Sequence, residues 1–309
     1  MHILVLGSAA GGGFPQWNCN HPNSRRARMH EPNAKPRTQS SIAVSNDGKR
    51  WFLFNASPDL RQQINDNPLL HPQQGLRHSP IQGVVLTNAD VDHITGLLTL
   101  RESQPLHLYG TQRVQAVLAA NAIFNVLNPE FVKREAIALN QPTELQNVDG
   151  SGSGIHIVAF PVPGKVALWL EDATKGPNFG SVEEDTVALE VRNGSGKTLF
   201  FYIPGCASMP PELNNRLRGA PLVLFDGTLW NDDEMIRDKV GVKTGKRMGH
   251  MSVGDGDGTI AAFRDLGVKR KIFIHINTTN PILLEDSPER AACTAAGWEV
   301  AYDGMEITV

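Results

Sequence analysis

Cysteine is scarce in this chain, which has three among its 309 residues: Cys19, Cys206 and Cys293. An odd number of widely separated cysteines argues against a disulfide framework and fits a reducing compartment. The chain also lacks any run of about 18 apolar residues, and no lysine or arginine precedes the short apolar stretch at its start. These absences favour a cytoplasmic protein without membrane insertion.

An excess of positive charge is missing as well. The chain has 29 lysines and arginines against 32 aspartates and glutamates, a formal net charge of −3, and no long basic run. That balance argues against nucleic acid and anionic membrane surfaces as partners. With 40% hydrophobic and 20% charged residues, the chain can bury a large core like an ordinary globular protein.

Short apolar segments rich in β-branched and aromatic residues alternate with segments of helical periodicity. Strands are predicted at 2–7, 40–46, 50–56, 81–87, 155–160, 186–193, 197–205, 221–227 and 271–277. Helices are predicted at 59–66, 92–103, 111–127, 259–267 and 287–297. The segment 147–154 has the composition of a linker, but strands resume on both sides of it. We therefore predict one α/β domain of four layers over residues 1–309.

A glycine-rich stretch, LGSAAGGG at 6–13, follows the first predicted strand. Its spacing does not fit the G-x-G-x-x-G pattern of dinucleotide-binding folds. The next segment, 14–36, contains four prolines and is interpreted as loop rather than helix. The glycines therefore predict a tight backbone turn beside a pocket.

Two aspartates and a histidine are crowded together where a strand gives way to a helix: Asp90, Asp92 and His93. Alternation along the chain places the two carboxylates on one side, and the first helical turn directs the imidazole toward the same crevice. Carboxylates and imidazoles bind divalent metals. The alternative is that Asp92 is only the N-cap of a helix and Asp90 a solvated turn residue.

The order of three motifs is similar to that of the metallo-β-lactamase superfamily. NADVDH at 88–93 stands where the superfamily has HxHxDH, GHMS at 249–252 resembles its phosphodiesterase and tRNA-processing branch, and IFIHIN at 272–277 resembles the strand before its last metal histidine. The resemblance spans nearly the whole chain and implies an αββα four-layer sandwich. It also implies a metal crevice at the strand ends.

The departures from the superfamily pattern imply that one of its two metal sites is lost. Asn88 and Asp90 replace the leading histidines, segment 159–165 lacks the next histidine, and Cys206 leaves at most a thiolate in place of the bridging aspartate. The resemblance leaves a single divalent metal on Asp92, His93 and His275, with Asp90 as a fourth ligand or a supporting group. Two histidines and one carboxylate are the ligand set of non-haem iron oxygenases, so Fe(II) is favoured, while Zn and Mn also fit.

Several longer segments resemble the pyrroloquinoline quinone (PQQ) biosynthesis branch of the superfamily. They lie at 6–28, 87–98, 203–207, 224–230 and 248–255. This likeness implies a small-molecule or dipeptide-like quinone precursor, dioxygen as co-substrate, iron-dependent hydroxylation of a tyrosine ring, and other PQQ-biosynthesis proteins as partners. The alternative is a carrier that helps move PQQ or its precursor toward the periplasm.

A second cluster lies in the sequence WNCNHPNS at 17–24. Relatives of the phosphodiesterase type hold a structural zinc in the equivalent loop, and the corresponding positions here are Cys19, His21, Ser24 and Thr278. Structural zinc generally takes four nitrogen or sulfur ligands, and two good ligands remain. The loop is predicted either to hold a second, structural zinc near Cys19 and His21 or to be a packed loop with Cys19 buried.

Two further residues are candidates for catalysis. His250, in the GHMS motif, is a candidate proton donor or substrate anchor, with a capping or core role as the alternative. Asp226, which ends a predicted strand, is either a group that supports the site or a turn residue. The arginines at 25, 26 and 28 are candidates for receiving an acidic substrate, with a solvated basic loop as the alternative.

Overall fold

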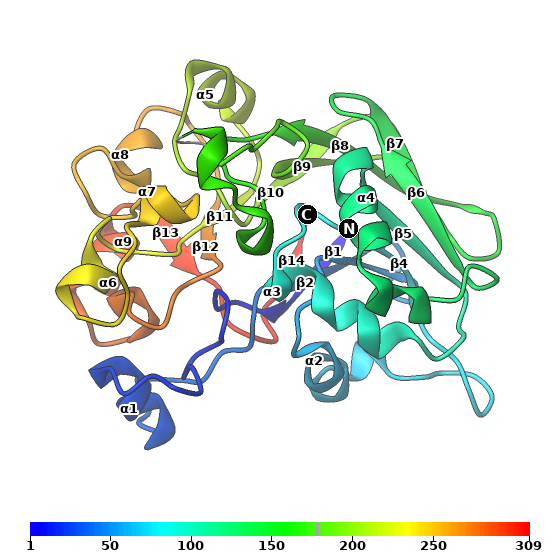
Figure 1. The fold of residues 1–309 in the computed structure, drawn as a ribbon, viewed down its shortest axis with the longest axis horizontal. Coiled ribbons are helices and arrows are strands. Elements are labelled where there is room, and N and C mark those ends of the chain that lie inside the picture. Colours follow the sequence, from blue (N-terminus) through cyan, green and yellow to red (C-terminus); the bar gives the residue numbers. More distant parts are fainter. Residues whose placement is uncertain (177–178) are drawn as a thin grey trace.

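Two β-sheets form the centre of the molecule (Figure 1). The structure is a computed structural model that describes residues 1–176 and 179–309. Each sheet has seven strands. The first runs, in spatial order, β14 (Glu306–Thr308), β1 (His2–Gly7), β2 (Ser41–Ser45), β3 (Trp51–Phe54), β4 (Ile81–Val85), β5 (Leu106–Thr111) and β6 (Val132–Ile137). The second runs β13 (Trp298–Val300), β12 (Lys271–Ile274), β11 (Val223–Asp226), β10 (Thr198–Ile203), β9 (Val187–Asn193), β8 (Gly152–Pro161) and β7 (Pro142–Gln146).

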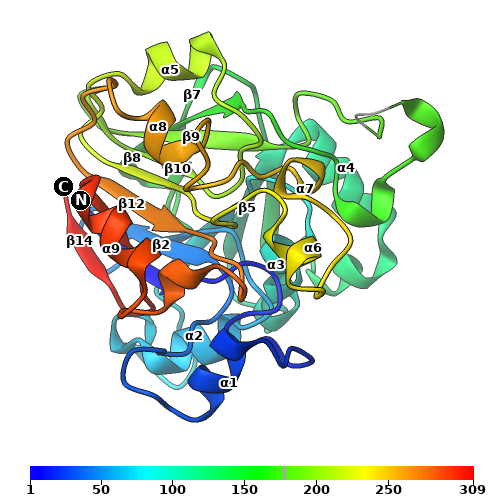
Figure 2. The same cartoon turned by 90° about the vertical axis from the view of Figure 1, so that its left-hand side faces the viewer.

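Helices cover the outer faces of both sheets, as the two views in Figures 1 and 2 show. The α-helices are α1 (Pro22–Arg28), α2 (Leu60–Asp66), α3 (Val91–Ile94), α4 (Gln112–Ala120), α5 (Pro211–Leu217), α6 (Glu234–Arg237), α7 (Gly245–Met248), α8 (Thr259–Ala262) and α9 (Pro288–Ala295). Helices α2, α3 and α4 share a hydrophobic cluster with the first sheet, and α5 and α9 share another with the second. The outer layers are therefore helical on both sides.

The alternation of side chains along the strands explains these layers. In β10, Phe200 and Tyr202 belong to the cluster between the sheets, whereas Phe201 faces the helices on the outside. In β1, Val5 points between the sheets and Leu4 points outward. Successive residues of a strand point to opposite faces, so strands covered on both sides are apolar throughout. The predicted α/β four-layer αββα sandwich is confirmed.

Parallel strands place the candidate residues at one edge of the sandwich. Strands β3 to β6 run parallel, as do β10 to β13. Asp92 and His93 follow the carboxyl end of β4, Asp226 ends β11, and His275 follows β12. The carboxyl ends of parallel strands are where α/β proteins build their sites.

Some elements differ from expectation. Segment 14–36 was expected to be loop, but it contains α1, because Pro22 occupies the first helical turn, where proline favours a helix. The helix expected at 92–103 is the short α3 followed by a 3₁₀ helix at Thr95–Leu100. The linker-like segment 147–154 contains the turn between β7 and β8, which pair in one sheet. Among the described residues, no helix is long and apolar enough to cross a membrane.

Candidate metal centre

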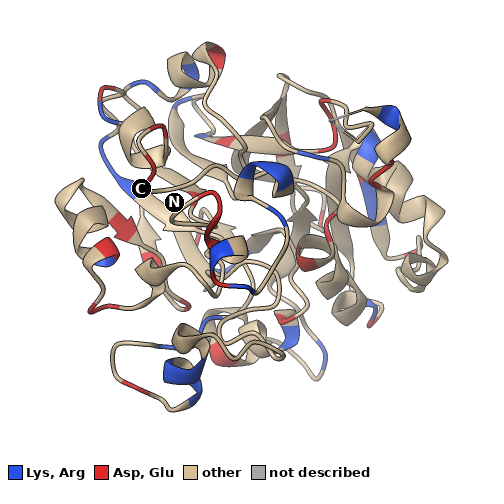
Figure 3. Cartoon of the chain, turned by 60° about the vertical axis from the view of Figure 1, so that its left-hand side comes forward, with Lys and Arg blue, Asp and Glu red and all other residues tan. Residues whose placement is uncertain are grey.

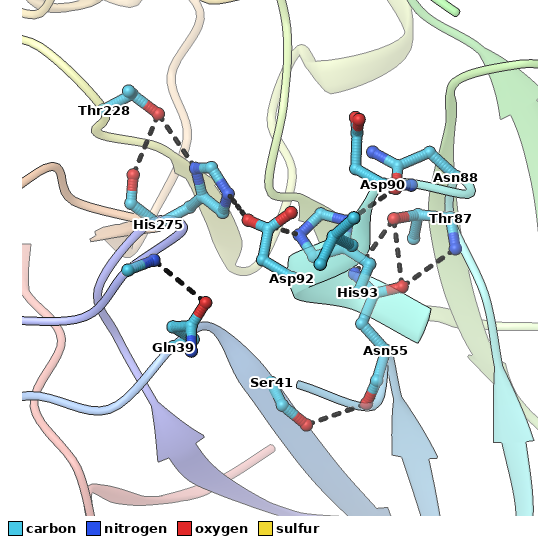
Figure 4. Close-up of polar contacts among 12 residues, drawn as sticks. Gln39, Ser41, Asn55, Thr87, Asn88, Asp90, Asp92, His93, Thr228 and His275 are labelled. Atoms are coloured by element: carbon cyan, nitrogen blue, oxygen red, sulfur yellow. Dashed lines mark hydrogen bonds and ion pairs between the residues drawn. The ribbon is translucent and has the colours of Figure 1, made fainter. Parts of the chain in front are cut away.

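Three side chains from the two halves of the chain meet between the sheets: Asp92, His93 and His275. One ligand atom of each lies within 4.8 Å of the others. The Nε2 atom of His275 is 3.0 Å from Oδ2 of Asp92, and Nε2 of His93 is 4.0 Å from the same oxygen (Figure 4). The predicted residues thus come together in a group of the size that one metal ion needs.

The orientation of His93 leaves one nitrogen free for a ligand. Its Nδ1 atom is 2.7 Å from Oδ1 of Asn88, and this amide oxygen also accepts a hydrogen bond from the backbone N–H of Asp90. The Nε2 atom is buried and has no hydrogen-bond partner. A buried polar atom without a partner is costly, and a metal ion would satisfy it. The residues therefore fit a metal at this position, and Asn88 sets the imidazole tautomer.

His275 is held in an unusual backbone conformation. Its φ angle is +59°, in the left-handed region that side chains other than glycine rarely adopt. The hydroxyl of Thr228 lies 2.9 Å from both the Nδ1 atom and the carbonyl oxygen of His275. Such strain is typical of functional sites, where surrounding contacts hold the residue in place. Here the contacts direct Nε2 toward Asp92.

The three groups shift one another's protonation. Burial alone would raise the pKa of Asp92, but the neighbouring imidazoles of His93 and His275 outweigh it and lower that pKa. Burial lowers the pKa of His93 to about 4. Burial also opposes the charged form of His275, but its hydrogen bond to Asp92 raises the pKa overall. A carboxylate and a neutral His93 at neutral pH are the forms that bind metals.

A second group of possible ligands adjoins the first and shares His275 with it. Asp226, His250 and His275 also lie within 4.8 Å of one another. The fully buried Asp226 lies 2.7 Å from Nδ1 of His250, and it accepts a hydrogen bond from the hydroxyl of Thr228 at 2.6 Å. With Nδ1 occupied, His250 presents its other edge to the pocket that it lines. The structure thus brings both predicted catalytic residues to the metal site.

Two other predicted positions lie differently. Asp90 lines the pocket, but it is not in either of the two metal-sized groups among the described residues, and its carboxylate accepts a hydrogen bond from the backbone of Leu168. Burial raises the pKa of Asp90. Cys206 is fully buried, its thiol contacts the carbonyl of Ser208, and burial raises its pKa well above the usual range. Cys206 belongs to neither metal-sized group among the described residues.

The interpretation of Asp92 as a helix cap is also wrong. Asp90 occupies the N-cap position of α3 without a side-chain capping bond, and Asp92 lies inside the helix. Its carboxylate contacts His275 instead. The strand-to-helix junction therefore directs Asp92 into the site.

The loop around Cys19 is built differently. The Nε2 atom of His21 lies 3.2 Å from the carboxylate of Asp238, and its Nδ1 accepts the N–H of Asn23 at the start of α1. Cys19 is half-buried, which contradicts the expectation of a simply buried thiol. Where relatives of the phosphodiesterase type have zinc ligands, Ser24 and Thr278 share a buried hydrogen bond of 2.7 Å. A zinc near Cys19 and His21 stays a prediction, with Asp238 as an added candidate ligand.

A pocket of about 470 Å³ opens onto the metal residues. Ala10 and Gly11 of the glycine-rich turn form part of its wall, and a side chain at Gly11 would approach Asp92 to 3.3 Å. The neighbouring glycine 12 has a φ angle of +95°. These features confirm the tight turn beside a pocket that the glycines predicted.

Sequence reasoning missed several residues of the site. Thr228, which contacts both His250 and His275, lies in segment 224–230 but was assigned no role. Two lysines on the pocket wall, Lys165 and Lys243, belong to no predicted motif. Thr228 follows Asp226 by two residues at the end of β11, a position that indicates a polar role. The lysines lie in loops, and their proximity depends on tertiary contacts that no local spacing reveals.

Comparison with known proteins agrees with the fold. A family model described as the beta-lactamase superfamily domain matches residues 50–276. The two-sheet sandwich with its metal-binding residues at the strand ends defines the same class. The chain is therefore a member of the metallo-β-lactamase superfamily.

Full-length relatives narrow this assignment. Coenzyme PQQ synthesis protein B of Gluconacetobacter diazotrophicus is 55% identical over 99% of both chains, and that of Xanthomonas campestris pv. campestris is 55% identical over the whole of both. A crystal structure of Zn²⁺-bound PqqB from Methylobacterium extorquens has a TM-score of 0.94 and 51% identity, with full coverage of both chains. The chain belongs to the coenzyme PQQ synthesis protein B family.

Proposed function

We propose that the chain acts in PQQ biosynthesis as a mononuclear non-haem iron oxygenase, which hydroxylates the tyrosine ring of a peptide-derived precursor. Family membership supports the pathway, and the ligand set supports the reaction. We further propose that the protein works in the cytoplasm, alongside other proteins of PQQ biosynthesis.

The observation that carries this proposal is the ligand set of Asp92, His93 and His275, gathered within 4.8 Å beside the pocket. One carboxylate and two imidazoles are the set that non-haem Fe(II) oxygenases use, and they leave positions for substrate and dioxygen. When bound, Fe(II) would supply the activation of dioxygen. Zinc, the ion in the Methylobacterium extorquens structure, suits the same nitrogen and oxygen donors.

His250 is placed to move a proton. Its Nδ1–H donates to the Asp226 carboxylate, so Nε2 carries the lone pair that faces the pocket. Such an imidazole accepts a proton at Nε2, here from a substrate phenol, and returns it later. Asp226 fixes the orientation of the ring. Thr228 contacts both His250 and His275, so it links the proton-transfer group to the metal ligands.

Apolar side chains form part of the pocket wall, together with the polar groups. They are Leu168, Met235, Val242 and Met248. Such a wall suits a planar aromatic ring.

Isotope-labelled dioxygen tests this function. The iron-loaded protein is incubated with a tyrosine-containing precursor without oxygen, where we expect no change, and ¹⁸O₂ is then admitted. We expect a mass gain that carries the label on the ring. His275→Ala should abolish the gain, because two ligands hold Fe(II) weakly. His71→Ala is the matched control, since the imidazole of this histidine contacts the Asn65 carbonyl and does not line the pocket.

Two outcomes would contradict the proposal. Product without label would exclude dioxygen as the source of the hydroxyl group. Equal hydroxylation by His275→Ala and the unaltered protein would exclude the assigned ligands. A protein that binds finished PQQ tightly and converts nothing would instead support the carrier.

A further inference from the structure

We propose that Lys165 and Lys243 form a carboxylate-binding pair on the wall of the pocket, which selects substrates that carry acidic groups beside an aromatic ring. This inference rests on the proposed function only in taking the substrate's aromatic ring to be that of tyrosine. The pair lies outside the metal-binding residues, and the lysines belong to two separate loops, at 162–167 and 238–244.

Both lysines line the pocket, yet neither is neutralised by a partner of its own. The Nζ atom of Lys165 lies 3.4 Å from Oε1 of Glu171 and 3.9 Å from the Asp90 carboxylate. The Nζ atom of Lys243 lies 3.7 Å from Oε2 of Glu171. The lysine side chains are 15% and 32% exposed, so a ligand in the pocket can reach them.

Glu171 is already engaged by a stronger partner. The guanidinium of Arg247 donates to both of its oxygens, at 3.3 and 2.7 Å, and this bond chiefly lowers the pKa of Glu171 to about 2. Glu171 does not line the pocket, so it lies behind the lysines. Bidentate pairing with arginine saturates a carboxylate in a way that a lysine does not. Three cations therefore surround Glu171, and Lys165 also lies near a second carboxylate, that of Asp90.

The lysines consequently keep hydrogen-bond donors for a ligand. The recorded hydrogen bond of Lys165 goes to the carbonyl of Val166 at 3.3 Å, and Lys243 makes only the ion pair with Glu171 within the described part of the chain. An ammonium group has three donors. Basic and acidic residues are interspersed along the chain (Figure 3), and the pocket lining itself combines the two lysines with Asp90 and Asp92.

The arrangement defines the class of ligand. Leu168 and Val242 adjoin the two lysines on the pocket wall, so apolar and cationic surfaces lie side by side. An aromatic ring near the metal residues, with one or two carboxylates toward the lysines, would satisfy both. A partly desolvated lysine–carboxylate pair is a charge-assisted hydrogen bond, which is stronger than one between neutral groups.

Calorimetric binding to the zinc-loaded protein tests the pair without turnover. The probes are the dipeptide glutamyl-tyrosine, which has two carboxylates, and glutaminyl-tyrosinamide, which has the same N-terminal ammonium group and no carboxylate. We expect the dipeptide to bind about tenfold tighter than the amide, a preference of about 1.4 kcal/mol. Lys165→Gln and Lys243→Gln should each weaken dipeptide binding by about fivefold, and the double variant should remove the preference.

The amide probe separates charge recognition from misfolding, because its Kd should not change in the variants. Lys246→Gln is the matched control, since this exposed lysine of α7 pairs with Asp257 and does not line the pocket. Four results would each overturn the proposed lysine pair. The double variant could keep the preference for the dipeptide, or Lys246→Gln could lose as much dipeptide affinity as the two lysine variants. The lysine variants could lose as much affinity for the amide as for the dipeptide, or the unaltered protein could fail to bind the dipeptide.

This test is independent of hydroxylation. If the dipeptide preference depends on the lysines but no label enters the product in the ¹⁸O₂ experiment, the pair stands and the proposed oxygenase fails. If labelled product forms while the preference survives in the double variant, the oxygenase stands and the pair is overturned.

Discussion

The crevice and the N-terminal loop both combine histidine with carboxylate, yet they differ in what their donor atoms do. In the crevice, Nδ1 of His93 donates to the Asn88 amide oxygen, and Nδ1 of His275 lies within hydrogen-bond distance of the Thr228 hydroxyl. The Nε2 atoms face the ligand position, and that of His93 has no partner. In the loop, both ring nitrogens of His21 are engaged, by Asp238 and by the N–H of Asn23.

The two regions have similar types of possible ligand, and they differ in the hydrogen bonds that orient the histidine rings. A histidine whose far nitrogen is fixed by an acceptor presents the near one in the correct tautomer and orientation. In the crevice His93 keeps its other ring nitrogen free for a metal, whereas in the loop the second nitrogen of His21 accepts the N–H of Asn23. We therefore expect the crevice to bind metal more tightly than the loop, and the following variants test that order.

The largest effect is expected from Asp92→Ala. This carboxylate lies nearest to both histidines of the triplet, and its removal leaves two imidazoles facing each other across a buried space. Losing a group that only supports a ligand lowers metal affinity by up to about 100-fold. Because Asp92 is itself a proposed ligand, we expect the metal affinity of the crevice to fall by more than that. Metal analysis after dialysis measures this.

Circular dichroism of the same Asp92→Ala sample should show the fold intact. Full metal content in that variant would mean that the ligands are wrongly assigned. If the spectrum shows that Asp92→Ala is unfolded, metal binding is measured on Asp92→Asn instead, because this variant keeps the side-chain volume and removes the charge.

A smaller effect is expected from Asn88→Ala. The Asn88 amide oxygen holds Nδ1 of His93 at 2.7 Å but does not belong to the ligand triplet. Its loss frees the imidazole to rotate, so metal affinity should fall by about 10- to 100-fold while the stoichiometry at saturating metal stays the same. Asn88→Asp is the companion variant, because an aspartate restores the acceptor. An affinity equal to that of the unaltered protein would show that Asn88 has no orienting role.

The sequence predicted the parts of the crevice that follow strand ends. Asp92 and His93 after β4 and His275 after β12 lie where the periodicity and the motif order placed them. The fold could be predicted for the same reason, because strands buried on both faces have a strong apolar pattern. Edge strands such as β6 and β14 were not predicted, because the exposed residues in them interrupt the apolar pattern.

Contacts between distant loops could not be predicted. Asp238 reaches His21 across 217 positions of the sequence, and Glu171 meets Arg247 across 76. No local period encodes such pairs, because the packing of the whole chain sets them. The role of Asn88 was hidden for another reason: its place in the motif suggested a lost ligand rather than a hydrogen-bond acceptor.

A still smaller effect on the crevice is expected from Cys19→Ser. Neither metal-sized group among the described residues includes Cys19 or His21, so crevice metal should remain bound at its original affinity. If the loop holds a structural zinc, the variant loses that ion alone, and the total falls from two equivalents to one. Metal analysis of Cys19→Ser beside Asp92→Ala separates the two sites. Loss of the crevice metal in Cys19→Ser would contradict the independence of the two sites.

The smallest effect is expected from Glu171→Gln, and it depends on pH. The bond to Arg247 chiefly lowers the pKa of Glu171 to about 2, below the value of about 4.3 for an unfolded chain. A carboxylate with a lowered pKa stabilises the fold above the unfolded value, and this contribution is lost as the pH falls toward the folded value. At pH 7 the variant should lose about 1 kcal/mol, because its cationic partners are partly exposed, and Tm should fall by about 2 °C. The deficit should shrink below pH 4 and vanish near pH 2, whereas Glu183→Gln, at an exposed position nearby, should show no deficit at either pH. A deficit that persists unchanged at low pH would assign the effect to packing rather than to charge.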